Sequence, residues 1–344
     1  MEPRTTSIHR LDLIMVPLAA LVVYMVLTAA PAYATFPGAN GRISFTRFVP
    51  ATNGNEIFSI RADGTDERQL TSDPPDHTSL FSDWPPDGSR ITFDSDRFNN
   101  GTDDIVDIFT MKADGSDIVQ LTSHAGFNGE PEYSPDGMKI AFESDRGVGF
   151  PLNGIYVMNA SDGSNVHRVT FPLSGEADVI PHFAPDGTRI AFTRARGCIF
   201  KGNGRFQRPK GCLAAVYVVN VDGSGLTRIT PWGFDTGVND WSPDGTKIAF
   251  NTGFDAHPGS TIDIYVVNPD GKHLTNLTNN PPLSAHCPLV VSFGAKWSPD
   301  GSKIVLTEDT CNGGGLSIMN ADGSGRHALT TNFEQISDWG TNQD

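Results

Sequence analysis

Trp241-Ser242-Pro243-Asp244-Gly245-Thr246-Lys247-Ile248-Ala249-Phe250 is the stretch that decides the fold, because the chain repeats it several times. Proline presets one backbone angle, aspartate offers a side-chain acceptor and glycine tolerates positive φ, so Pro-Asp-Gly favours a tight turn. The short apolar run after the turn is typical of a β-strand. Four more copies of an aromatic residue followed by a Pro-Asp-Gly turn begin at Trp84, Tyr133, Phe183 and Trp297.

A second turn ends in Asp-Gly and occurs six times, with its aspartates at Asp63, Asp114, Asp162, Asp222, Asp270 and Asp322. An alternating apolar run such as Ile264-Tyr265-Val266-Val267 precedes each of these turns. A run that ends in Leu-Thr or a close match, such as Leu277-Thr278, follows each of them. Each repeat of roughly 50 residues therefore predicts four antiparallel strands, A to D, joined by tight turns.

One four-stranded sheet cannot bury both of its faces alone, whereas radial packing of several sheets around an axis buries them. The first repeat begins with a B-type run, Asn40-Gly41-Arg42-Ile43-Ser44-Phe45, and has no A-type run before it. The last segment, Ile336-Ser337-Asp338-Trp339-Gly340, is an A-type run with no B-type run after it. We therefore predict an all-β, six-bladed β-propeller over residues 36-340. A split blade closes it, pairing the C-terminal strand A with the N-terminal strands B, C and D.

Residues 1-34 have the pattern of a signal peptide. Basic Arg4 and Arg10 flank the start of an apolar stretch from Leu13 to Ala30, and Ala32-Tyr33-Ala34 offers a signal peptidase site. Retention as a membrane anchor is the alternative, because the apolar stretch nearly spans a bilayer. We expect export to the periplasm, cell envelope or extracellular space, with no stable membrane span after removal of the leader.

The formal net charge of −15 argues against nucleic acid as a partner, because its phosphates would be repelled. An acidic surface permits cationic partners, metal ions or basic protein segments. The same charge is also expected if it only keeps an exported protein soluble. We expect the protein to be a monomer.

The two faces of the predicted propeller differ. The A–B and C–D turns lie on one face, and their nearly identical sequences indicate a structural role. The B–C and D–A connections lie on the other, which we call the variable face. Long loops on a rigid scaffold commonly carry binding sites, and the longest connections here span residues 195–214, 253–261, 279–290 and 308–315.

All four cysteines fall in these connections, and an even number in an exported chain predicts disulfides. Of the three possible pairings we favour Cys198–Cys212 and Cys287–Cys311, which join neighbouring loops. The loop between Cys198 and Cys212 is basic, in contrast to the acidic remainder. It is either a contact for an anionic ligand or partner, or a solvated insertion, and its basic residues are Lys201, Arg205, Arg208 and Lys210.

Acidic residues recur on or just before strand A, which surrounds the axis of a propeller. Carboxylates that converge at the mouth of the channel would suit a calcium ion or a cationic peptide. Alternatively, some of them bond neighbouring backbone or hydroxyl groups. These candidate ligand-binding residues are Asp83, Glu130, Glu132, Asp178, Asp240 and Asp338.

The repeated pattern W-S-P-D-G-x-x-I-A-F followed by I-Y-V, D-G and L-T resembles the propeller repeat of TolB and related periplasmic proteins, a WD40-like repeat family. The resemblance covers nearly all of residues 36-340. It implies a TolB-like propeller whose face and channel bind peptide segments of partner proteins, sometimes with a calcium ion in the channel. TolB itself carries an α/β domain before its propeller, whereas only a leader precedes the repeats here, so a stand-alone propeller is expected.

We expect a non-catalytic binding or scaffold propeller that recognises a protein segment or glycan and requires no cofactor. The alternative is a metal-dependent carbohydrate-active enzyme of the polysaccharide lyase type, because some lyases resemble TolB-like propellers. Its metal would need convergent histidines, and the candidates lack H-x-H or H-x-x-x-H spacing: His77, His124, His182, His257 and His286. A purely structural envelope component is a third possibility. A serine hydrolase is disfavoured, since no G-x-S-x-G motif occurs.

Overall fold

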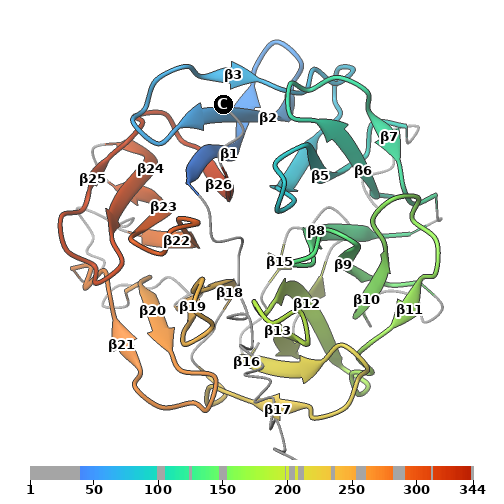
Figure 1. The fold of residues 1–344 in the computed structure, drawn as a ribbon, viewed down its shortest axis with the longest axis vertical. Coiled ribbons are helices and arrows are strands. Elements are labelled where there is room, and N and C mark those ends of the chain that lie inside the picture. The colour runs from blue at the N-terminus through green and yellow to red at the C-terminus, as the bar shows by residue number, and fades with distance from the viewer. Residues whose placement is uncertain are drawn as a thin grey trace, which may run out of the picture. The chain divides into compact units, whose positions relative to one another are not determined.

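The structure is a computed structural model, which describes residues 39–98, 105–123, 126–146, 153–197, 199–200, 206–207, 213–233, 237–252, 261–281, 291–310 and 313–341. The chain divides into two units, Met1–Pro31 and Ala32–Asp344, and every described residue belongs to the second. In this unit six four-stranded antiparallel sheets surround a central axis as blades (Figure 1). The predicted all-β, six-bladed propeller is confirmed.

The first three blades, with their strands in the order A to D, follow one another around the ring. Blade 1 contains β26 (Gln335–Thr341), β1 (Asn40–Val49), β2 (Gly54–Arg61) and β3 (Arg68–Gln69). Blade 2 contains β4 (Ser79–Asp83), β5 (Arg90–Ser95), β6 (Asp107–Lys112) and β7 (Val119–Gln120). Blade 3 contains β8 (Asn128–Tyr133), β9 (Lys139–Ser144), β10 (Gly154–Asn159) and β11 (His167–Arg168).

The other three blades repeat the pattern, and blade 4 carries an extra hairpin in its B–C connection. Blade 4 contains β12 (Glu176–Phe183), β13 (Arg189–Arg196), β16 (Leu213–Asn220) and β17 (Thr227–Arg228), and its hairpin contains β14 (Ile199–Phe200) and β15 (Phe206–Gln207). Blade 5 contains β18 (Gly237–Trp241), β19 (Ile248–Asn251), β20 (Ile264–Val267) and β21 (Thr275–Asn276). Blade 6 contains β22 (Val291–Trp297), β23 (Lys303–Thr310), β24 (Gly313–Asn320) and β25 (His327–Ala328).

The split blade closes the ring as predicted. Strand β26 pairs antiparallel with β1, and Trp339 lies opposite Ile43. Arg47 Nε of β1 also donates to Glu334 Oε1 at 2.9 Å, a contact between residues 287 positions apart in the sequence. The pairing removes the exposed edges that an open array of blades would have.

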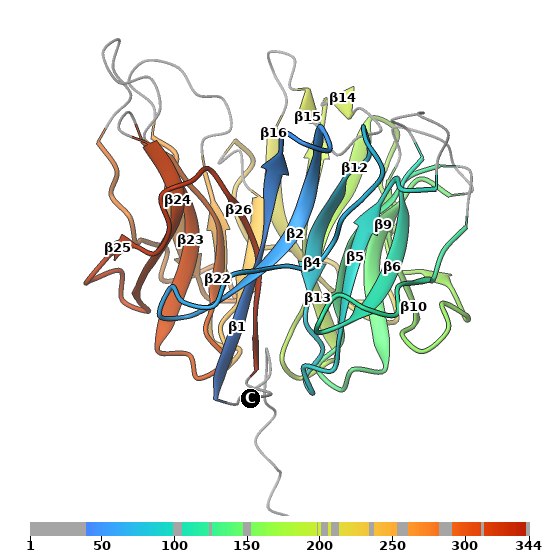
Figure 2. The ribbon, with the colours of Figure 1, turned by 90° about the horizontal axis from the view of Figure 1, so that it is seen from above.

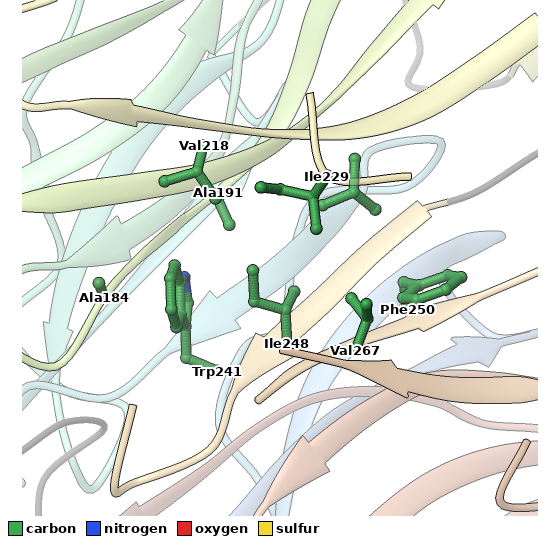
Figure 3. Close-up of a cluster of buried hydrophobic side chains, with 9 residues drawn as sticks. Ala184, Ala191, Val218, Ile229, Trp241, Ile248, Phe250 and Val267 are labelled. Carbon is green, nitrogen blue, oxygen red and sulfur yellow. The ribbon is translucent and has the colours of Figure 1, made fainter. Parts of the chain in front are cut away.

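The hydrophobic core is divided into layers between neighbouring blades. In the layer between blades 4 and 5, the fully buried Trp241 packs with Ile248 and Val267 of its own blade against Ala191 and Val218 of blade 4 (Figure 3). The aromatic residue before each Pro-Asp-Gly turn therefore fills the space between two sheets. This packing explains why the repeat keeps a large ring at that position.

The tight turns are held by their own residues. Asp244 Oδ1 accepts hydrogen bonds from the Thr246 backbone N–H at 3.0 Å and from the Ser242 hydroxyl at 2.6 Å. Gly245 has a φ of 67°, which glycine adopts without the steric cost that a Cβ would add. These bonds support the structural interpretation of the face that carries the A–B turns.

The two faces lie at opposite ends of the strands. Seen edge-on, the β14–β15 hairpin lies at the top of the ring, and β26 ends at the bottom, on the side of the A–B turns (Figure 2). The part of the chain that the structure describes contains no helix with the length and apolar character that a membrane span needs.

Candidate binding cavity

A cavity of about 620 Å³ lies along the axis of the ring, and residues from all six blades line it. Its rim lies on the variable face and includes Asn53 of the β1–β2 turn, His77 before β4 and Asp96 after β5. Phe48 at the end of β1 also lines the rim and is 51% exposed. The cavity thus reaches the variable face, where the sequence predicts binding.

Irregularities in strand A shape the cavity wall. The pairing of strand A with strand B shifts register in every blade. Near the shift, Phe81, Glu130 and Ile180 have positive φ values of 49°, 51° and 56°. Residues other than glycine rarely adopt such a backbone conformation, and it is least favourable for the β-branched Ile180. All three residues line the cavity. Bulges re-aim side chains, and backbone strain of this kind is concentrated at functional sites.

The residue directly before the strand A aromatic residue lies near the axis in all six blades. We call these six the floor residues: Asp83, Glu132, His182, Asp240, Lys296 and Asp338. Asp83, Glu132 and Lys296 line both the main cavity and a second cavity of only about 10 Å³, which Pro135 lines on the side of the A–B turns. His182 lines only the main cavity, and Asp240 and Asp338 line only the second. The floor residues therefore separate the main cavity from the other face.

The four floor carboxylates link neighbouring blades. Each accepts a hydrogen bond from the backbone N–H of the aromatic residue in the next blade. The bonds are Trp84 N to Asp338 Oδ2 at 3.0 Å, Tyr133 N to Asp83 Oδ2 at 2.8 Å, Phe183 N to Glu132 Oε1 at 3.1 Å, and Trp297 N to Asp240 Oδ2 at 2.8 Å. These carboxylates therefore have a structural role at the blade interfaces.

Lys296 is the ammonium group among the floor carboxylates. Burial alone would lower the pKa of Lys296, but the carboxylates, with Asp240 first, outweigh it and raise this pKa. Burial raises the pKa of Asp240 to about 8, although Lys296 opposes the rise. The pKa values of Asp83 and Glu132 are also raised well above the usual range, mainly by burial.

His182 completes the floor as a neutral group. Burial and the nearby Lys296 ammonium hold the pKa of His182 well below its usual value. Its Nδ1 lies 3.4 Å from Lys296 Nζ and also contacts Glu132. A neutral imidazole beside an ammonium accepts a hydrogen bond through one ring nitrogen, so His182 extends the network without adding charge.

A second group of carboxyls, which we call the acidic triad, comprises the buried Asp94 and Glu143 and the half-buried Glu130, whose Oε2 atom is itself buried. Asp94 Oδ2 accepts the Glu130 backbone N–H at 2.8 Å, and Glu143 Oε2 accepts the Ile180 N–H at 3.3 Å. Asp94 and Glu130 line the main cavity. Burial raises the pKa of Glu130 to about 8, and burial together with the neighbouring carboxyls raises the pKa values of Asp94 and Glu143 well above their usual range.

The structure places the candidate carboxylates in three environments. Asp83, Glu132, Asp240 and Asp338 meet on the floor, and Glu130 lies on the wall. Asp178 is fully buried in β12 and forms a bidentate ion pair with Arg194, with contacts of 2.6 and 2.7 Å. It does not line the cavity.

Other candidate residues fall on the rim or outside the described part of the chain. His77 lies on the rim and His182 on the floor. The basic residues of the blade 4 loop, all four cysteines and three histidines lie outside the described residues: Lys201, Arg205, Arg208, Lys210, Cys198, Cys212, Cys287, Cys311, His124, His257 and His286. Both disulfide pairings remain predictions.

The floor does not have the ligand arrangement that a calcium ion requires. Calcium takes six to eight oxygen ligands, whereas the floor places an ammonium group and an imidazole among its carboxylates. Among the described residues, no three or more His, Cys, Asp or Glu side chains are arranged to hold a metal ion. The described floor residues therefore do not form a calcium site by themselves, and the calcium ion that the resemblance implies stays a prediction.

The sequence analysis missed Lys296 and two members of the acidic triad, Asp94 and Glu143. Lys296 directly precedes Trp297, the same position that the floor aspartates occupy in other repeats, so alignment of the repeats would have found it. Asp94 and Glu143 follow the apolar B-type runs. No sequence signal showed that these positions face the wall formed by the next blade.

Residues 98–203 match a family model described as the TolB β-propeller domain. Together with the six blades and the likeness of solved TolB structures, this match shows which propeller the ring resembles. The described ring is a TolB-like β-propeller. The cavity described above is the axial channel of this propeller.

A sequence relative and a solved structure show how much of the chain resembles known proteins. An uncharacterized protein of Agrobacterium fabrum is 30% identical over 197 residues, which cover 56% of this chain and 60% of that protein. The crystal structure of TolB from Acinetobacter baumannii superposes with a TM-score of 0.60 at 24% identity, covering 88% of this chain and 65% of that one. The chain thus spans less than two thirds of each of these relatives.

The fold is also shared with an enzyme. An oligogalacturonate lyase in complex with manganese superposes with a TM-score of 0.52 at 15% identity, covering 87% of this chain and 74% of that one. At this identity the likeness shows the propeller fold alone.

Proposed function

We propose that the protein is a non-catalytic binding or scaffold propeller outside the cytoplasm, which recognises a protein segment or glycan on its variable face. The observation that carries this proposal is the axial cavity, which is open to that face and closed below by the floor residues. Concave sites with apolar walls and a few polar groups are typical of ligand binding. The proposed location rests on the leader sequence of residues 1-34.

The chemistry of the wall supports binding. Phe48, Phe81 and Phe127 provide apolar area close to the rim, and Asp76, Asp96 and Glu130 provide carboxyls. The buried Ser82 Oγ and Asn251 Nδ2 atoms belong to residues that line the cavity, and neither has a hydrogen-bond partner. Buried polar atoms without partners are rare, and a bound ligand is one way of satisfying them.

Photo-crosslinking tests this proposal in the cells that produce the protein. Benzoylphenylalanine at Phe48, on the rim, is expected to form a covalent adduct whose mass identifies a peptide or a sugar. The matched control places the same group at Met138, which is 69% exposed in an A–B turn. The proposal fails if both positions give the same adducts or if the Phe48 variant gives none.

A metal-dependent carbohydrate-active enzyme of the lyase type is the second candidate. It is favoured by the occurrence of both His77 and His182 in the lining of one cavity and by the fold shared with the manganese-bound lyase. Metal analysis of protein purified without chelators separates the two candidates. Stoichiometric manganese or zinc that is lost in the His77→Ala and His182→Ala variants would favour the enzyme.

A further inference from the structure

Several buried carboxylates elsewhere in the ring have an arginine partner, and others, such as Glu56 and Asp263, accept several hydrogen bonds from hydroxyl and backbone donors. Asp73 lies 2.8 Å from Arg97, Asp178 lies 2.6 Å from Arg194, and Glu334 contacts Arg47. Burying a carboxylate is costly unless a cation or several hydrogen bonds compensate it. These pairs and hydrogen bonds show how the ring usually compensates the charge of a buried carboxylate.

The acidic triad departs from this pattern. Within the described residues, no basic side chain forms an ion pair with Asp94, Glu130 or Glu143. Glu130 Oε2 is buried without a hydrogen-bond partner. Ser82, only 2% exposed, lines the same cavity, and its Oγ atom is also unpartnered. The wall thus presents two buried oxygen atoms, Glu130 Oε2 and Ser82 Oγ, that have no hydrogen-bond partner.

An aromatic ring lies directly beside the acidic triad. A methyl group placed on Gly129 would lie 2.4 Å from Phe127 Cζ and 2.9 Å from Asp94 Oδ2, so ring and carboxylate meet across this glycine. Phe81, at the bulge of β4, lines the cavity as well. Carboxylates next to aromatic rings form the environment that guanidinium groups prefer, because their edges donate hydrogen bonds while their faces stack.

We propose that the acidic triad and the adjacent Phe127 form a subsite for a guanidinium or ammonium group, supplied by a basic side chain of the bound protein segment. A metal ion is a poorer occupant, since no described group of side chains has a metal-binding arrangement. A basic side chain brings its own donors, and its alkyl stem suits the apolar rim. The inference rests on the proposed binding function and specifies the chemistry of that site.

The guanidinium or ammonium group bound at this subsite competes with protons for the carboxylates of the acidic triad. Glu130 is faced by Asp94 and, behind it, Asp96 on the blade 2 side, by Glu143 from β9 and by Lys296 from β22. With a pKa of about 8, Glu130 is mostly protonated at pH 6 and mostly ionised at pH 9. A cation therefore binds more tightly at the higher pH and releases protons as it binds.

The test uses argininamide and its neutral isostere citrullinamide as probes of the full chain, by isothermal titration at pH 6 and pH 9. We expect argininamide alone to bind, and to bind more tightly at pH 9. The Glu130→Gln variant keeps the side-chain shape and should weaken this binding about tenfold or more, as expected for a lost charged hydrogen bond. The Glu308→Gln variant is the matched control, because Glu308 lies outside the cavity and pairs with Arg326 at 3.1 Å.

Two results would overturn the proposal. One is equal binding of argininamide and citrullinamide, or unchanged binding of argininamide by the Glu130→Gln variant. The other is a calcium or manganese ion that binds in a Glu130-dependent manner while argininamide does not. Melting curves of both variants establish that they fold. A photo-adduct at Phe48 without argininamide binding would reject the cation subsite and leave the binding function standing.

Discussion

The floor and the acidic triad are two clusters of largely buried carboxyls in the same channel. They differ because the floor includes a cationic side chain and the triad does not. The floor contains Lys296, and its carboxylates also accept backbone N–H groups from neighbouring blades. The triad has two backbone donors and the Asn153 side chain, which bonds Glu143, and it has no ion pair among the described residues. The comparison teaches that residue type alone does not mark a binding site. A satisfied cluster holds the fold together, whereas an unsatisfied one is available to a ligand.

Removal of the floor cation is expected to have the largest effect. The Lys296→Met change leaves several buried carboxyls without their counter-ion, which costs about 3 kcal/mol of the free energy of unfolding. Urea denaturation measures the loss, with Lys272→Met as control because that side chain is 74% exposed. Addition of Asp240→Asn to Lys296→Met should recover part of the loss. Equal midpoints for wild type and Lys296→Met would contradict the structural role of the floor.

The pH dependence of stability is the next largest effect. Glu130 and Asp240 have pKa values of about 8 in the folded protein, and ordinary values near 4 are expected after unfolding. The folded state therefore binds more protons between about pH 4 and pH 8, so stability falls as the pH rises, by up to about 1.4 kcal/mol per pH unit for each group.

The Glu130→Gln variant sharpens this expectation because glutamine carries no titrating proton. Its free energy of unfolding should fall less steeply between pH 5 and pH 9 and should exceed that of the wild type at pH 9. Denaturation curves at several pH values measure the slope. A slope identical to that of the wild type would mean that the triad stays ionised and uncoupled from folding.

The smallest effect is expected at the strained wall. Ile180→Gly relieves a positive φ but removes a half-buried side chain, and these effects oppose each other, so stability should stay within about 1 kcal/mol of the wild type. Val179→Gly is the control, since Val179 is 1% exposed, and it should be clearly less stable. Equal losses in thermal denaturation would show that the bulge stores no strain.

The sequence predicted the fold because the repeat carries local chemistry. The incomplete repeats that begin at Asn40 and Ile336 predicted the split blade, and the Pro-Asp-Gly turns predicted the A–B hairpins. Four floor carboxylates could be predicted because each directly precedes an aromatic residue of strand A. The search for acids alone then left out Lys296, and His182 was considered only as a metal ligand, although both occupy the same position in other blades.

The acidic triad could not be predicted, because it depends on contacts between blades. Asp94 and Glu143 belong to strand B, and the N–H groups that they accept belong to bulges in the next blade. Register shifts in strand A have no signature in the repeat. Asp178 shows the converse, since its pairing with Arg194 depends on which residues β12 and β13 place opposite each other.

The split blade also fixes the order of events during biosynthesis. Strand β26 emerges from the ribosome, or from a secretion channel, after every other strand of the ring. Until then blade 1 lacks its innermost strand, and Trp84 lacks the Asp338 acceptor for its backbone N–H. The complete floor of the channel therefore forms only after β26 has emerged, so an incomplete chain presents an unfinished site to its surroundings. Ring closure thus makes the complete channel floor a property of the fully synthesised propeller.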